Sequence, residues 1–231
     1  MERVVEMDQK RCYQRCVGLL LFIGLLFFFF SEVQARDDWE YWGEYSFKYK
    51  ITDKASLKIA PKMKARDDFS NPYFWESAQG MSYKLSKNFD IGVYHLAAKE
   101  DRAGKDKTES RFRGEFNLHA LFKGMKLSNR HRYEYRTFNI GESKDRYRNR
   151  IQLTFSPIDV LGHTLIPYIS NEFFYDLEES EYNKNRALLG FSKKLSKKMK
   201  VGIYYMAESN RRGSDWDEKH IVGTKLDFNL N

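Results

Sequence analysis

The sequence predicts an all-β protein, a closed antiparallel transmembrane β-barrel of 10–12 strands with a polar, arginine-rich lumen. Three observations predict this fold. Apolar and polar residues alternate along most of the chain, the alternating segments have 10 to 14 residues, and short turns alternate with longer charged connections. A strand in a soluble sandwich has about 5–6 residues, whereas a tilted strand that crosses an outer membrane needs about 9–11. The segment length therefore favours a membrane barrel.

A targeting segment precedes the alternating region. Residues 1–16 are polar and include several basic side chains, and residues 17–30 are an unbroken apolar run. Small or modest residues, Val33 and Ala35, occupy the −3 and −1 positions of a cut after Ala35. This order is typical of a secretory signal peptide, with cleavage expected after Ala35. An uncleaved anchor is the alternative, but fourteen apolar residues are fewer than the roughly 20 that span a bilayer. We expect a cleaved signal peptide at 1–35 and one barrel domain at 36–231.

Five alternating segments follow the expected cleavage site. In the first, Trp39, Tyr41 and Tyr45 occupy every other position, and in the second apolar residues alternate with lysines. In the fifth, Phe112 and Phe116 alternate with arginine and glutamate. Because side chains alternate between the two faces of a strand, each segment predicts a strand with one apolar face. The five segments are 38–50, 56–65, 73–85, 88–98 and 109–122.

Six further segments continue the pattern. Tyr147, Ile151 and Leu153 alternate with arginines, and Val201 and Ile203 continue the alternation near the end of the chain. The segments are 125–138, 145–156, 164–176, 185–195, 199–209 and 219–230. The total of eleven conflicts with the even strand number usual in bacterial outer-membrane barrels. The sequence therefore leaves the strand number at 10–12.

The connections predict two kinds of link. Short ones, at Ser86-Lys87, Lys123-Gly124 and Ser196-Lys197-Lys198, predict tight turns. The stretches between the other segments are longer and charged, and predict loops at 99–108, 139–144, 177–184 and 210–218. Short turns at one end and longer loops at the other are typical of outer-membrane barrels.

The candidate functional site is a set of arginines on the polar face of the predicted strands. If hairpins close at the turn 123–124 and the loop 139–144, Glu115 faces Arg132 and Arg113 faces Glu134 on the first. On the second, Glu134 faces Arg148, Arg132 faces Arg150 and Arg136 faces Arg146. The candidate anion-binding residues are Arg111, Arg113, Arg130, Arg132, Arg136, Arg146, Arg148, Arg150 and Arg186, with Glu115, Glu134 and Glu172 as counter-charges.

These arginines are expected to face the lumen, because an arginine at mid-depth on the lipid face costs about 2–4 kcal/mol. A cationic lumen attracts anions, and guanidinium groups match carboxylates and phosphates. The first hypothesis is a passive channel or binding path for small anionic solutes. The second is a structural or adhesive barrel with a plugged lumen, because barrels of about eight strands are filled by side chains and those of sixteen or more hold a channel.

Other function classes have weaker support. A soluble secreted sandwich or lipocalin-like barrel would place the apolar face inside. An outer-membrane lipid hydrolase would pair serine with histidine, but none of the five histidines has a serine two residues later. The net charge of +8 also fits nucleic-acid binding, but export argues against that partner. Cys12 and Cys16 lie within the leader, so the mature part has no thiolate. We expect no cofactor, metal site or catalytic residue.

Four stretches resemble a known family. They are LSNRHRYEYRT (127–137), DRYRNRIQLTF (145–155), TLIPYISNEFFYDL (164–177) and NRALLGFSKKLSKKMKVGIYYM (185–206). Together they resemble a bacterial outer-membrane barrel family of unknown function, the domain-of-unknown-function family numbered 2490. More distantly, the arginine tracks are similar to those of small porins for acidic oligosaccharides. The resemblance implies a location in the outer membrane, with the bilayer, lipopolysaccharide and the barrel-assembly machinery as partners. It implies no activity.

Overall fold

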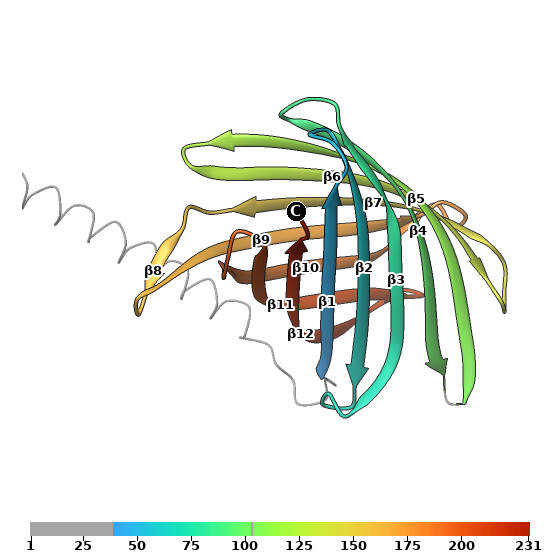
Figure 1. Cartoon of the computed structure of the whole chain (residues 1–231). Helices are drawn as coiled ribbons and strands as arrows, with labels where there is room; N and C mark the ends of the chain where they lie inside the picture. The colour runs from blue at the N-terminus through green and yellow to red at the C-terminus, as the bar shows by residue number, and fades with distance from the viewer. Residues whose placement is uncertain (1–38, 103) are drawn as a thin grey trace, which may run out of the picture. The chain divides into compact units, whose positions relative to one another are not determined.

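The computed structural model describes residues 39–102 and 104–231, so the expected signal peptide lies outside the described residues. The described chain forms twelve strands (Figure 1). They are β1 (Trp39–Lys50), β2 (Ala55–Arg66), β3 (Asn71–Lys84), β4 (Phe89–Arg102), β5 (Lys105–Phe122), β6 (Met125–Phe138), β7 (Lys144–Thr154), β8 (Ile158–Val160), β9 (His163–Asp176), β10 (Glu181–Lys194), β11 (Met199–Arg212) and β12 (Asp215–Asn229). The described residues include no helix that is long and apolar enough to span a membrane.

Eleven of these strands form a closed barrel, which confirms the predicted fold. Consecutive strands pair in antiparallel fashion from β1 to β7, then β7 with β9, and on to β12, while the short β8 pairs with the start of β9. The barrel closes through a parallel pair, β1 with β12, from Trp39 beside His220 to Lys48 beside Asn229. The prediction of a wholly antiparallel barrel did not include this pair. An up-and-down chain with an odd number of strands ends in the direction in which it began, so its first and last strands meet in parallel.

The barrel strands correspond one to one with the eleven predicted segments, but two predicted loops are wrong. Where a loop was expected at 99–108, β4 continues to Arg102 and β5 begins at Lys105. Where one was expected at 210–218, β11 and β12 run to either side of Gly213-Ser214. Charged side chains mark where a strand meets water rather than where its hydrogen bonding ends. The strands therefore extend as charged hairpins beyond their apolar stretches.

The connections at 51–54, 85–88, 123–124, 155–162 and 195–198 lie at one end of the barrel, and those at 67–70, 139–143, 177–180 and 213–214 lie at the other. The prediction of short turns at one end and longer loops at the other is wrong, because the longest connection, 155–162, lies at the end with the tight turns. The tight turn predicted at Lys123-Gly124 is confirmed. Its φ angles of 47° and 80° are the positive values of a two-residue hairpin turn that continues the right-handed strand twist.

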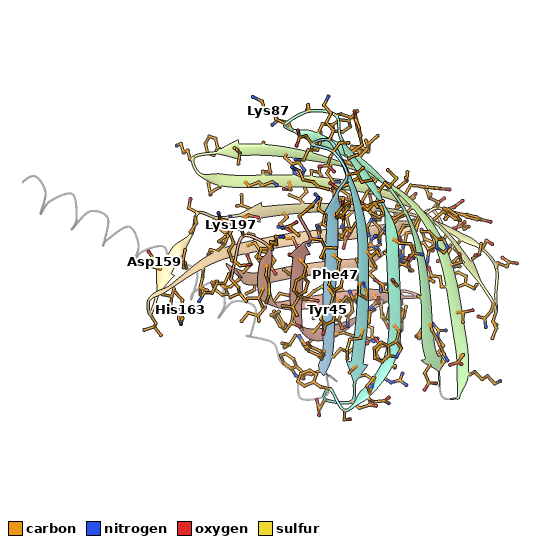
Figure 2. The ribbon with its side chains drawn as sticks, viewed as in Figure 1. Tyr45, Phe47, Lys87, Asp159, His163 and Lys197 are labelled. Carbon is orange, nitrogen blue, oxygen red and sulfur yellow. The ribbon has the colours of Figure 1, made fainter. Side chains whose placement is uncertain are left out.

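The two faces of the barrel wall differ in chemistry. Along β5 the inward residues are partly or fully buried and mostly charged, while the outward residues are exposed and largely apolar. Large apolar side chains are exposed on several strands, among them Val93 at 67 %, Phe112 at 64 % and Ile203 at 58 %. Figure 2 labels Tyr45 and Phe47, which lie on the apolar face of β1. The outer surface of the barrel is therefore largely apolar, as the interior of a soluble protein is.

Tyrosine rings inside the barrel lie against glycines of the neighbouring strands. A Cβ atom on Gly223 would overlap the ring of Tyr204, one on Gly190 would overlap Tyr168, and one on Gly80 would overlap Tyr94. A strand glycine often marks such a close approach. Because the rings lie along the wall, they leave the centre of the lumen to other side chains.

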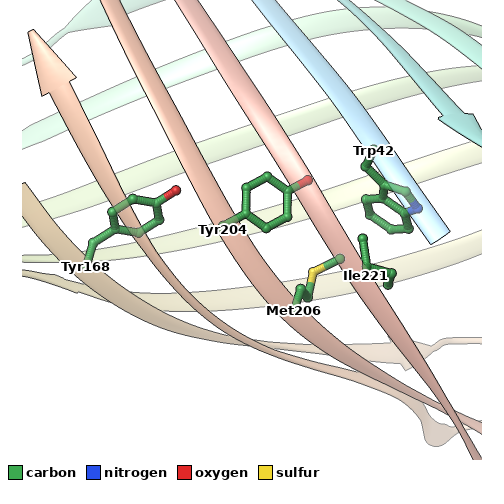
Figure 3. Close-up of a cluster of buried hydrophobic side chains, with 5 residues drawn as sticks. All are labelled: Trp42, Tyr168, Tyr204, Met206 and Ile221. Atoms are coloured by element: carbon green, nitrogen blue, oxygen red, sulfur yellow. The ribbon is translucent and has the colours of Figure 1, made fainter. Parts of the chain in front are cut away.

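One side of the lumen includes a buried apolar cluster, which refines the prediction of a polar interior. Trp42, Tyr168, Tyr204, Met206 and Ile221 form a buried cluster on β1, β9, β11 and β12 (Figure 3). In the strand order β11, β12 and β1 lie across the barrel from β5, β6 and β7, which bear most of the candidate arginines. The arginine-bearing strands thus form a cationic wall, and the opposite side combines this apolar cluster with charged residues such as Glu44 and Lys225.

Candidate functional site: the luminal arginines

A cavity of about 790 Å³ occupies the lumen. Its lining includes Lys200 near the start of β11 and Arg211 and Arg212 at the end of that strand. The cavity therefore runs along almost the whole length of the wall. All nine candidate arginines line it, together with Glu172. Glu115 and Glu134 do not line the cavity and lie within the network behind it.

The register of the first predicted hairpin is confirmed, and that of the second is wrong. On β5 and β6, Glu115 faces Arg132 and Arg113 faces Glu134, as expected. On β6 and β7 the observed partners are Glu134 with Arg146, Arg132 with Arg148, Arg130 with Arg150 and Arg136 with Lys144. The prediction placed the loop centre one residue too late, because β6 and β7 are joined by a connection whose sequence specifies no particular turn. A shift of two residues keeps every side chain on its face.

Glu134 is the centre of the arginine network and is fully buried. Arg148 Nη1 donates to Glu134 Oε1 at 2.8 Å, and Arg146 Nη2 donates to Oε2 at 2.5 Å. Arg111 and Arg132 each place an Nη1 atom 3.5 Å from Oε1. One carboxylate thus holds four guanidinium groups from β5, β6 and β7.

Glu172 on β9 extends this network, as the sequence predicted. It accepts hydrogen bonds from Arg130 Nη2 at 2.6 Å and from Arg148 Nη2 at 2.9 Å. Arg186 Nη1 lies 3.9 Å from Glu172 Oε2, and its Nε donates to Glu208 at 2.6 Å. The arginine network therefore runs from β5 through β6, β7, β9 and β10 to β11.

Sequence reasoning missed several charged residues of the lumen. Glu109 accepts hydrogen bonds from Arg111 and Arg136, both at 2.7 Å, and Glu44 accepts one from Lys62 at 3.1 Å. Glu109 lies two residues before Arg111 on the same face, which was a usable signal. The luminal lysines alternate with apolar residues on β2, and the same alternation could have placed them. They include Lys58, Lys62 and Lys64.

Cations outnumber anions around the cavity. Nineteen lysines and arginines line it, against seven aspartates and glutamates. Trp42 in the apolar cluster also faces cations: Lys62 and Lys64 lie 3.8 and 4.0 Å from its ring centre, and Arg186 lies 4.9 Å from it. Ring faces attract cations without neutralising them. The cavity therefore has an excess of positive charge.

Comparison with known proteins places this barrel in a family. The family model described as "Protein of unknown function (DUF2490)" matches residues 39–219, which include every candidate arginine. The chain belongs to this family. A search of curated proteins found no match for this DUF2490 chain.

Among solved structures, the DUF2490 chain is similar to an anion-selective porin from Comamonas acidovorans. The identity is 10 % and the TM-score is 0.36, over 74 % of this chain and 55 % of the porin. The chain spans about half the length of that porin.

Two histidines of the DUF2490 chain contact serines on neighbouring strands, which a search along single strands could not find. His95 Nε2 lies 2.9 Å from Ser110 Oγ, with Gln79 at 3.2 Å from the other ring nitrogen. His119 lies 3.2 Å from Ser128 Oγ and 2.7 Å from Asp90. Both serines lie within paired strands.

The described residues contain no cluster of three or more histidine, cysteine or acidic side chains that would hold a metal ion. The lumen is lined by charged side chains. Guanidinium and ammonium groups are hydrogen-bond donors, and a positive lining can attract anions.

Proposed function

We propose that this chain is an outer-membrane β-barrel protein that passes or binds small anionic solutes in its lumen. One observation supports the proposal most strongly. A cavity that follows the strands for almost their whole length is lined by far more cations than anions. Such a lining raises the local concentration of anions and repels cations.

The outer surface supports the membrane location. Side chains such as Val93, Phe112 and Ile203 are more than half exposed, and a soluble monomer rarely exposes so extensive an apolar surface. A closed barrel also leaves no unpaired strand edge in lipid. On this proposal the partners are the bilayer, lipopolysaccharide and the machinery that assembles outer-membrane barrels, and the leader at 1–35 directs export.

The arginine side chains support small oxyanions as solutes. Guanidinium groups pair with carboxylate and phosphate through two parallel hydrogen bonds. The cavity volume of about 790 Å³ lies within the range of ordinary small-molecule sites. A solute of modest size is therefore expected.

Conductance of the purified protein in planar bilayers tests the proposal. We expect discrete current steps in potassium chloride, and the same steps after assembly from detergent or from urea. Absence of current in every salt would contradict passage of ions. Recovery of the protein in the soluble periplasmic fraction would contradict the membrane location.

A structural barrel with a plugged lumen is the second candidate. The observation that favours it is the density of contacts inside, namely the buried cluster around Trp42 and the fully buried Glu134 with its four arginines. Liposome swelling separates the two candidates. Swelling in small organic acids supports the channel, and intact liposomes with correctly folded protein support the plugged barrel.

A further inference from the structure

Among the described residues, four cations that line the lumen have no acceptor. One of them, Lys64, lies over the rings of Trp42 and Phe74, 4.0 and 4.4 Å from their centres. In the described part of the chain, the other three, Lys58, Arg113 and Arg150, form no ion pair or hydrogen bond through their side chains, although Arg113 lies 4.8 Å from the ring centre of Tyr94. The neighbouring Arg132, in contrast, donates two hydrogen bonds to Glu115, at 2.9 and 2.8 Å. The unpaired cations come from β2, β5 and β7.

Unsatisfied polar atoms gather in the same region. Within residues 39–102 and 104–231, the buried side-chain atoms without a hydrogen-bond partner are Arg113 Nε, Arg130 Nε and the Tyr168 hydroxyl. Arg130 and Arg150 face each other on β6 and β7, Tyr168 lies on the neighbouring strand β9, and Lys58 and Arg113 line the same cavity. We call Lys58, Arg113, Arg130, Arg150 and Tyr168 the donor cluster.

The acidic residues nearby do not neutralise the donor cluster. Glu115 is bound by Arg132, and Glu172 is shared by Arg130, Arg148 and Arg186. Buried donors are rarely left without acceptors, and like charges held together repel. A bound anion would relieve both costs.

We propose that the donor cluster is a binding site for a doubly charged oxyanion, such as a phosphate dianion or a phosphate monoester. The inference rests on the proposed function, in which anions enter the lumen. Guanidinium, ammonium and phenol groups are all donors, so the ligand must supply only acceptor oxygens. Three unpaired positive charges from three strands favour two negative charges over one. The paired residues Arg111, Arg146 and Arg148 then hold the wall together and leave binding to the unpaired ones.

Block of the chloride current by inorganic phosphate tests this site. At a pH where the dianion predominates, added phosphate should reduce the chloride current of the wild-type protein, whereas acetate should not. Lys58→Gln, Arg113→Gln and Arg150→Gln should each raise the phosphate concentration for half block about tenfold, the effect of losing one charged hydrogen bond. Tyr168→Phe removes only the hydroxyl and should raise it about threefold.

The matched control is Lys87→Gln. Lys87 is exposed in the turn between β3 and β4 and does not line the cavity, so its loss should leave the phosphate block unchanged. Glycerol phosphate in place of inorganic phosphate distinguishes the two sources of the ligand: block by both assigns the site to phosphate esters as well, and block by inorganic phosphate alone assigns it to the free ion.

The outcomes separate the two proposals. A chloride current that phosphate leaves unchanged overturns the oxyanion site and leaves the proposed function standing. Absence of any current contradicts the channel. Broadening of the phosphorus NMR signal of added phosphate by the protein in micelles then tests whether the donor cluster binds the anion. Broadening lost in Arg113→Gln and kept in Lys87→Gln supports it, and no broadening overturns it.

Discussion

Glu134 and Arg148 form a hydrogen-bonded ion pair inside the barrel, with 2.8 Å between Arg148 Nη1 and Glu134 Oε1. Arg148 Nη2 also donates to Glu172 at 2.9 Å, so one guanidinium links a carboxylate on β6 to a carboxylate on β9. Glu134 in turn contacts three more arginines. The cationic wall is held together by very few acidic residues.

Loss of the charge on Glu134 should therefore destabilise the barrel. Glu134→Gln leaves four buried guanidinium groups without their shared carboxylate, and we expect a loss of about 3–5 kcal/mol in the free energy of unfolding. Urea titration in detergent or lipid, followed by gel mobility, measures it. The control is Glu142→Gln in the exposed 139–143 turn, expected within about 0.5 kcal/mol of wild type. Equal stability of the two variants would contradict the central role of Glu134.

The contact of Tyr204 with Gly223 predicts that alanine destabilises the barrel at position 223 and not at every glycine. Gly223→Ala should cost about 1–3 kcal/mol, because the methyl group would force the ring off the wall. Gly114→Ala is the matched control, since nothing lies within 4 Å of a Cβ atom at that position. In the Tyr204→Ala background the penalty at 223 should largely disappear. A penalty that persists there would show that the ring contact is not its cause.

The apolar outer face predicts that a charged side chain destabilises the barrel more when it lies on this face than when it lies in a turn. Val93→Arg should lower the stability of the barrel in a bilayer by about 2–4 kcal/mol, because residue 93 is 67 % exposed on that face. Ser214→Arg, in the turn between β11 and β12, should have almost no effect. Folding in vesicles at increasing urea concentration measures both. A tolerated Val93→Arg would place this face in water.

The serine–histidine pairs predict no hydrolysis. Purified protein should cleave nitrophenyl esters no faster than Ser110→Ala or Ser128→Ala variants, because the strand amides around both serines are already bonded. Initial rates with short and long acyl chains provide the measurement. A rate that disappears in one serine variant and persists in the other would establish an active site.

Alternation and length made the barrel strands predictable, because a strand with one apolar and one charged face repeats every two residues. The β5–β6 register was equally predictable, since Lys123-Gly124 specifies a two-residue turn. The β6–β7 register was not, because five residues of varied composition connect those strands. The parallel pair of β1 and β12 and the contacts of Glu44 with Tyr204 and Lys225 depend on closure of the whole barrel. No local pattern encodes which distant side chains then meet.

The lumen is expected to prefer anions to cations. The reversal potential in a potassium chloride gradient measures this preference most directly. We predict a potential toward the chloride equilibrium value for the wild-type protein. Removal of the unpaired charges of Lys58, Arg113 and Arg150 should move it toward zero. A reversal potential on the potassium side, unchanged in those variants, would contradict an anion-attracting lumen.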